Sequence, residues 1–118
     1  MDVFTATTLA ALVLHEIDAV RCKEWRIFPL TFWMPERVGR HVFLWAHVPL
    51  ALLIYYYATH TPHEFALFMA YFAPLHFVAH VLYLWHPKNL FRDARSWLIL
   101  TASLLSATLY WLIGPYSF

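Results

Sequence analysis

Four long apolar stretches fill most of the sequence and restrict the folds that it can adopt. We expect helices at residues 3–28, 35–59, 62–86 and 93–113. Each stretch has the roughly 20 residues with which a helix crosses a bilayer core about 30 Å thick. Hydrophobic residues make up 62% of the chain and charged residues 13%, unlike a water-soluble domain. The sequence therefore predicts one all-α integral membrane domain, residues 1–118, folded as a four-helix up-and-down bundle.

Prolines and capping residues set the expected helix ends. Pro29 and Pro87 end the first and third helices, because the residue before a proline avoids helical geometry. Pro35 suits the first turn of the second helix. The third helix opens with Thr61-Pro62-His63-Glu64, which has the form of a capping box, and Asp93 is a candidate N-cap for the fourth.

The first apolar stretch is expected to remain in the mature protein. Asp2 stands where a signal peptide would carry basic residues, and no small-residue cleavage site precedes Arg21. Cys22 is the only cysteine, so an internal disulfide cannot form.

The basic residues lie at one predicted end of the bundle. All of them flank the first or the third connection, while the second connection and both terminal segments contain none. The positive-inside rule then places both basic connections in the cytoplasm and both termini outside, and we expect the bacterial inner membrane. Because these residues border membrane-length segments, we expect membrane lipid and no nucleic acid as a partner. They are Arg21, Lys23, Arg26, Arg37, Arg40, Lys88, Arg92 and Arg95.

The first helix contains the ionisable run His15-Glu16-Ile17-Asp18. Ionisable residues are costly inside a membrane, so this run indicates a functional site. His15 and Asp18 are three residues apart and share a helix face. Glu16 lies about 100° from His15 and about 160° from Asp18 around the helix, so we expect it to face the next helix or to hydrogen-bond a histidine behind the main site.

Histidines in the second and third helices are expected at a similar depth. Counted from the basic end at 1.5 Å per residue, Asp18, His47 and His76 fall within about 3 Å of one layer. His15 lies one turn further out and His80 one turn further in. The i, i+4 spacing of His76 and His80 suits two ligands of one metal. The predicted metal ligands are His15, Asp18, His47, His76 and His80.

Pro49 and Pro74 interrupt the second and third helices close to these histidines. Each proline removes a helical hydrogen bond and favours a kink, which leaves the carbonyl of Trp45 or Ala70 without its usual partner. The kinks indicate a pocket beside the histidines. Alternatively, neighbouring helices satisfy the freed carbonyls.

The fourth helix is expected to serve as a packing wall. Small residues spaced four apart let helices approach closely. Two such pairs occur, Ser103 with Ala107 and Ala102 with Ser106.

Polar residues at the membrane edges are expected to have ordinary structural roles. Glu24 and Trp25 lie beside Arg21 and Arg26, which favours an ion-pair cluster at the interface. Histidines near helix ends can be solvated or contact lipid headgroups. These are His41, His60, His63 and His86.

The first-helix motif, the Glu24-Trp25 pair and the histidines of the next two helices resemble small bacterial membrane families of unknown function, including those named for an HXXEE motif. The acids stand here at the second and fourth positions, Glu16 and Asp18, so the double-acid pattern is not reproduced. The resemblance implies a helical membrane bundle and supplies no activity.

The favoured functional hypothesis is a metal site. His47, His76 and His80 would supply nitrogen ligands, and Asp18 or His15 would complete the set. Such ligands suit zinc or non-haem iron, and an open position would activate water or oxygen beside a lipid-like substrate. We therefore favour a metal-dependent enzyme acting on a lipid-phase substrate.

Other functions remain open. Haem b could be held by His47 with His76, although the two glycines of the chain leave little room for a porphyrin. Without a cofactor, Asp18 and Glu16 would be the catalytic acid and base of an isomerase or cyclase acting on an isoprenoid-like substrate, or would relay protons. The chain could also be a non-catalytic subunit of a larger membrane complex, or a homo-oligomer.

Overall fold

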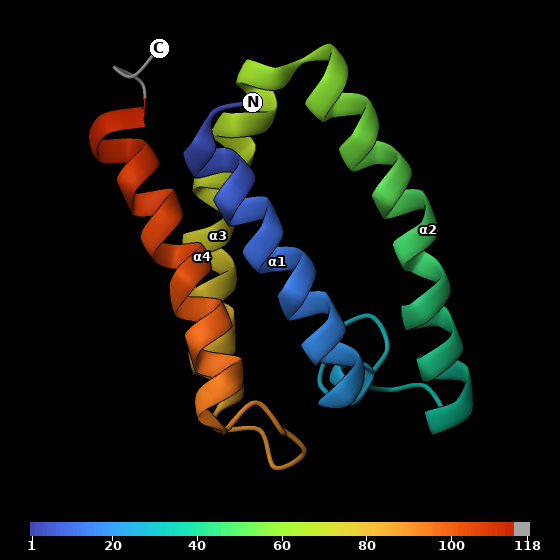
Figure 1. Cartoon of the computed structure of the whole chain (residues 1–118). Coiled ribbons are helices and arrows are strands. Elements are labelled where there is room, and N and C mark those ends of the chain that lie inside the picture. The colour runs from blue at the N-terminus through green and yellow to red at the C-terminus, as the bar shows by residue number, and fades with distance from the viewer. Residues whose placement is uncertain (115–118) are drawn as a thin grey trace.

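The computed structural model describes residues 1–114 and contains four long helices (Figure 1). These are α1 (Val3–Arg21), α2 (Glu36–His60), α3 (Pro62–Tyr83) and α4 (Ala94–Ile113), and a short 3-10 helix, η1 (Glu24–Arg26), follows α1. Each long helix has the length and apolar composition to cross a membrane. No strand occurs in the described part of the chain, which confirms the predicted all-α fold with four candidate spans.

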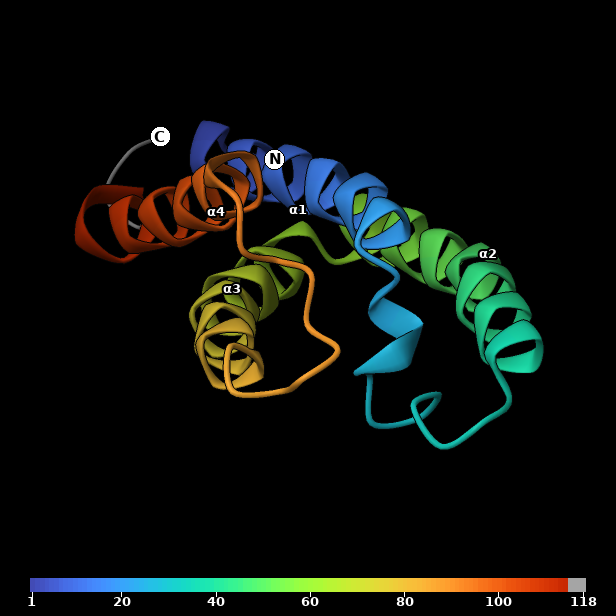
Figure 2. The same ribbon diagram turned by 90° about the horizontal axis from the view of Figure 1, so that it is seen from below.

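The long helices alternate in direction along the chain (Figure 1). The N-terminus, the α2–α3 turn and the last turn of α4 lie at one end, and the two longer connections lie at the other. α1, α3 and α4 form the packed core, in which the α1–α4 interface is the most extensive. α2 lies on the side of α1 away from α4 and contacts mainly α3 and η1 (Figure 2).

α2 is a peripheral helix. Only 6% of its most apolar segment is buried, compared with 33% in each of the other three helices. Gly39 and Phe43 are its buried residues. In a membrane, most of the α2 surface therefore faces the surroundings of the protein.

The small residues of α4 allow it to pack closely against α1. Ser103 is 0% and Ala107 1% exposed, as expected for a small-residue interface. Of the second predicted pair, Ser106 is buried and its hydroxyl hydrogen-bonds the Thr8 hydroxyl of α1 at 2.6 Å, whereas Ala102 is exposed. One face of α4 is thus fixed against α1 by both packing and a hydrogen bond.

A residue of α4 satisfies the carbonyl that Pro74 frees in α3. The indole Nε1 of Trp111 donates to the carbonyl oxygen of Ala70 at 2.9 Å. Both proline-containing helices are continuous, since α2 runs through Pro49 and α3 through Pro74. At Pro74 the neighbouring helix therefore supplies the missing donor.

The end of α1 differs from the expected one. The helix stops at Arg21 and not at residue 28, because Lys23 adopts the left-handed conformation with φ of 52° and ψ of 52°. A left-handed residue cannot continue a right-handed helix. η1 therefore turns away from the axis of α1, and this change of direction repositions Glu24.

The boundaries of α3 also show local differences. Residues 84–86 donate to carbonyls three residues earlier, so the chain tightens after Tyr83 as it approaches Pro87. At the other end, the predicted capping box is absent: the Thr61 hydroxyl donates to the Tyr57 carbonyl of α2 at 3.2 Å. Pro62 nevertheless occupies the first position of α3.

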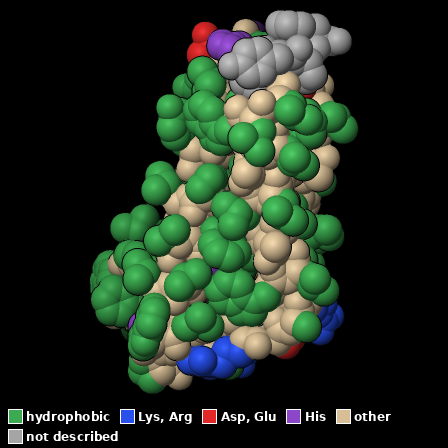
Figure 3. Space-filling view, turned by 90° about the vertical axis from the view of Figure 1, so that its left-hand side faces the viewer, with side chains coloured by type: hydrophobic (Ala, Val, Ile, Leu, Met, Phe, Trp, Pro, Cys, Tyr) green, Lys and Arg blue, Asp and Glu red, His purple; other side chains and the backbone are tan. Residues whose placement is uncertain are grey.

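The outer surface suits a bilayer. The molecule measures 47 × 29 × 18 Å, so its long axis exceeds the roughly 30 Å of a hydrocarbon core. Figure 3 shows a broad hydrophobic band, with the visible Lys and Arg side chains gathered below it. The basic connections thus lie together at one end of the molecule.

Candidate metal centre

Four side chains with metal-ligating atoms converge near the basic end of the core. His15 comes from α1, Glu24 from η1, and His76 and His80 from α3. Each offers one nitrogen or carboxylate oxygen, and all four atoms lie within 4.8 Å of one another. We call these four residues the His/Glu cluster.

The cluster is almost closed to the exterior. The exposed fractions are 1% for His15, 0% for His80 and 6% for Glu24, while His76 is half-buried. The ring of His15 lies edge-to-face with those of His76 and His80, with centroid distances of 4.5 and 4.6 Å. The half-buried ring of His76 is therefore the exposed side of an otherwise enclosed group.

The histidines lack the hydrogen bonds that buried rings normally make. Both ring nitrogens of His15 and His80, and Nδ1 of His76, are buried without a hydrogen-bond partner. Buried polar atoms in proteins are nearly always satisfied, and unsatisfied ones often mark an ion or a catalytic role. Each neutral ring has one nitrogen lone pair to offer a cation.

Glu24 carries the negative charge of the cluster. Its Oε1 lies 3.2 Å from Nε2 of His80 and 3.8 Å from Nε2 of His15, in contacts that lack hydrogen-bond alignment. Burial alone would raise the pKa of Glu24, but its interactions with the two histidines outweigh burial and lower the pKa to about 2. The carboxyl group is therefore ionised at neutral pH and available as a ligand.

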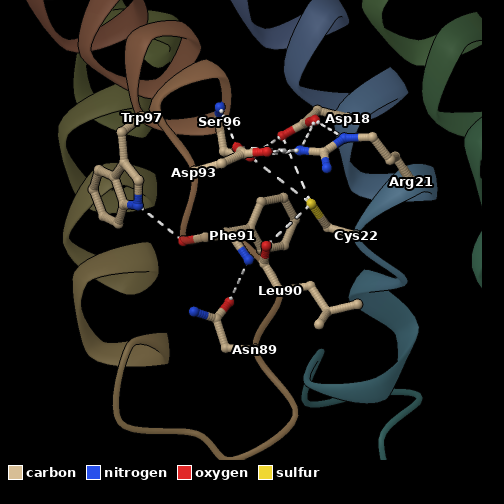
Figure 4. A network of polar contacts seen from close by, with 9 residues as sticks. All are labelled: Asp18, Arg21, Cys22, Asn89, Leu90, Phe91, Asp93, Ser96 and Trp97. Carbon is tan, nitrogen blue, oxygen red and sulfur yellow. Dashed lines mark hydrogen bonds and ion pairs between the residues drawn. The ribbon is translucent and has the colours of Figure 1, made fainter.

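Aromatic rings enclose the cluster. Phe91, in the connection before α4, stacks on His15 with a centroid distance of 5.4 Å and lies edge-on to His80 at 4.6 Å. Phe91 is 0% exposed, and its backbone is fixed on both sides, by the Asn89 carboxamide and by the Trp97 indole (Figure 4). This connection therefore closes the basic end of the cluster.

Asp18 belongs to a different network, between α1 and α4 (Figure 4). Its carboxylate pairs with the Arg21 guanidinium at 2.7 Å and accepts a hydrogen bond from the Ser96 hydroxyl. Arg21 also pairs with Asp93, the N-cap of α4, at 3.1 Å. Asp18 thus has a cation and a hydroxyl partner and joins two helices.

His47 also has its own partner. Its Nε2 contacts the carboxylate of Glu16 on α1, and its Nδ1 lies 2.7 Å from the Phe43 carbonyl oxygen. Glu16 therefore faces α2, one of the two positions expected for it. This pair bridges α1 and the peripheral helix α2.

The structure brings together three of the five predicted ligands, His15, His76 and His80, and places Asp18 and His47 in separate networks. Spacing along one helix had paired His76 with His80, whereas the depth count had put His15 two turns from His80. Neither could show that α2 diverges from the core. Glu24 was expected in an interfacial ion pair. Its actual position follows from the end of α1 just before Lys23, and no proline or glycine in the sequence marks this end.

Residues 1–116 match the model of a family described as "Family of unknown function (DUF6713)", so the chain belongs to this family. No curated protein and no solved structure gives a significant match to the chain.

Proposed function

We propose that this member of the family binds a divalent metal ion through His15, Glu24, His76 and His80. The observation that carries the proposal is the set of buried ring nitrogens that make no hydrogen bond, beside an ionised carboxylate. Glu24 has only two histidines beside it and no permanent cation, and a metal ion would supply one. Without an ion, the cluster concentrates several unsatisfied polar atoms in one place.

Zinc fits this ligand set best, and iron(II) is the second candidate. Three imidazoles and one carboxylate suit either ion, and zinc favours four ligands in a tetrahedron. A zinc ion with bonds of about 2.0–2.1 Å holds neighbouring ligand atoms roughly 3.4 Å apart. Since the four atoms already lie within 4.8 Å, small side-chain movements would complete the site.

Haem b fits the cluster less well. A porphyrin must lie as a plane between its two axial ligands. The three histidine rings contact one another directly, and Phe72 stacks on His76 at 5.3 Å. His47, the other proposed axial ligand, is engaged with Glu16. These contacts favour a single ion.

Elemental analysis with a visible absorption spectrum tests the proposal on detergent-purified protein prepared without chelators. We expect about one zinc or iron ion per chain, lost from His15→Ala and His80→Ala. His47→Ala is the matched control, because this histidine also lies within a span but outside the cluster. Circular dichroism checks that each variant remains helical.

Three results would overturn the metal proposal. Metal-free wild-type protein that also fails to bind added zinc or iron would leave acid-base chemistry, proton relay or a structural subunit role. A Soret band lost in His80→Ala would establish haem instead. Equal metal loss from His47→Ala would place the ion elsewhere.

An apolar groove favours a lipid-phase substrate for this metal site. The groove, of about 370 Å³, lies between α2 and α3 and is lined by Leu53 and Phe68, among others. The Phe68 and Phe72 rings stack at 5.6 Å, and Phe72 in turn stacks on His76. This row of rings joins the groove to the exposed side of the cluster. A hydrocarbon chain that continued from the groove along Phe68 and Phe72 would reach the ion at His76, which supports a metal-dependent enzyme.

Lipid analysis of the purified protein tests the groove separately. Leu53→Trp should fill the groove and remove copurifying lipid while metal content stays unchanged. Leu52→Trp is the control, since this exposed residue of α2 does not line the groove. Equal lipid content in both variants would exclude the groove as the substrate site.

The location also forms part of the proposal. The basic end supports an orientation in the bacterial inner membrane with both termini outside the cytoplasm. The resemblance of the His15-Glu16-Ile17-Asp18 run to the HXXEE families agrees with a membrane role. A homo-oligomer or a larger complex would cover the surface of α2.

A further inference from the structure

A second pocket lies at the basic end, between η1 and the start of α2. It has a volume of about 640 Å³, within the range of small-molecule sites. Its charged and aromatic lining residues are Lys23, Trp25, Glu36, Arg37, Arg40 and His41. We call this the basic pocket.

Its three strong cations are free of side-chain hydrogen bonds and ion pairs within residues 1–114. They are Lys23, Arg37 and Arg40, and all three are exposed. Glu36, the single acid in the lining, is already engaged by Arg26 at 3.0 Å and by the Trp25 indole at 3.0 Å. The pocket therefore holds a net positive charge.

The placement of the cations points to one ligand position. Arg37, Arg40 and His41 follow the i, i+3, i+4 spacing of one helix face, and Lys23 meets them from the end of α1. Lys23 is the single described non-glycine residue with positive φ. Such a conformation is unfavourable for a side chain with a Cβ, and it holds the lysine at the pocket.

We propose that the basic pocket binds the phosphate of an anionic membrane phospholipid. Arginine guanidinium groups match the geometry of phosphate oxygens, and lysine adds a point charge. The pocket opens at the end where the Lys and Arg side chains gather below the hydrophobic band (Figure 3). Lipid phosphates lie at this level of a bilayer, so the ligand is part of the membrane. The proposal is independent of the metal site.

Calorimetric titration of short-chain phosphatidylglycerol into the protein in neutral detergent tests this assignment. The double variant Arg37→Gln/Arg40→Gln should bind about 30-fold more weakly, because each basic side chain near a membrane surface changes affinity roughly fivefold. The control, Lys88→Gln/Arg95→Gln, removes the same charge from exposed residues at the same end but outside the pocket, and should change affinity by less than about threefold.

Phosphatidylcholine and inorganic phosphate complete the test. Clear preference for phosphatidylglycerol over both would support the proposal. Inorganic phosphate binding as tightly as phosphatidylglycerol would identify a soluble phosphate compound as the ligand and overturn the lipid assignment. Equal weakening by the two double variants would show only general surface attraction. Circular dichroism of both variants separates loss of binding from loss of fold.

Discussion

At the scale of single residues, the two buried acids of the cluster region have opposite surroundings. Asp18 pairs with Arg21 and accepts a hydrogen bond from the Ser96 hydroxyl. The partners of the Glu24 carboxylate are two histidines, His15 and His80. The histidines favour the ionised carboxylate of Glu24 and lower its pKa, and a bound metal would add a permanent cation and further stability. Glu24 would therefore have two sources of stability, the histidines and the ion.

Glu24→Gln separates these two effects. In metal-free protein we expect the melting temperature to fall, because the lowered pKa of Glu24 means that folding favours its ionised form beside His15 and His80. Zinc at 100 times its Kd should add about 2.7 kcal/mol to the free energy of unfolding of the wild type and so raise its melting temperature. It should have little effect on the variant. Thermal unfolding in detergent with chelator or zinc measures both.

Asp18→Asn is the control for this prediction. It breaks the pair with Arg21 and should destabilise the protein equally with and without zinc, since Asp18 lies outside the His/Glu cluster. If zinc stabilised Glu24→Gln as much as the wild type, Glu24 would not be a ligand of the ion.

At the scale of helices, hydropathy and proline positions predicted the four spans but not the early end of α1. The four helices and the buried face of α4 follow from apolar length and small-residue spacing. The left-handed Lys23 does not, because no residue preference favours lysine there. Since η1 begins at the next residue, this one backbone angle decides whether Glu24 reaches the cluster.

The position of α2 relative to the other helices could not be predicted from the sequence either. The depth count put His47 and His76 in one layer and His15 two turns from His80, but depth says nothing about the distance between helix axes. Because α2 packs mainly on α3 and η1, His47 meets Glu16 and not the three clustered histidines. Helix spacing depends on side-chain packing over whole interfaces, which local patterns do not report.

The Trp111 indole should stabilise the α3–α4 interface through the carbonyl that Pro74 frees. Trp111→Phe removes the donor to Ala70 and keeps an aromatic ring beside Tyr71, so we expect a loss of about 1 kcal/mol. In a Pro74→Ala background the same change should cost less, because residue 74 then supplies its own N–H to the Ala70 carbonyl. Unfolding of the four proteins of this double-mutant cycle measures the difference.

An additive cycle would contradict this explanation. Trp111→Phe would then act through packing alone, and the hydrogen bond from the indole to the Ala70 carbonyl would contribute nothing to stability.

At the scale of the whole molecule, the distribution of charge supports the orientation proposed for the chain in a membrane. The helices alternate in direction, so the α2–α3 turn lies on the opposite side from both basic connections (Figure 1). Under the proposed orientation, with the basic loops in the cytoplasm, this turn would lie outside. The basic pocket would face the cytoplasmic leaflet, whose anionic lipids are the ligands proposed for it.

Single added cysteines test this orientation. His63→Cys, near the start of α3, should react with a membrane-impermeant maleimide in intact bacteria. Lys88→Cys, in the α3–α4 connection, should react only after permeabilisation. Both positions are exposed in the structure. The native Cys22 should contribute little background, because it is 2% exposed and burial raises the pKa of its thiol. The opposite labelling pattern would reverse the orientation and move the basic pocket to the outer leaflet. Labelling of both cysteines in intact cells would show two coexisting orientations, and positive charge would then not determine the topology of this chain.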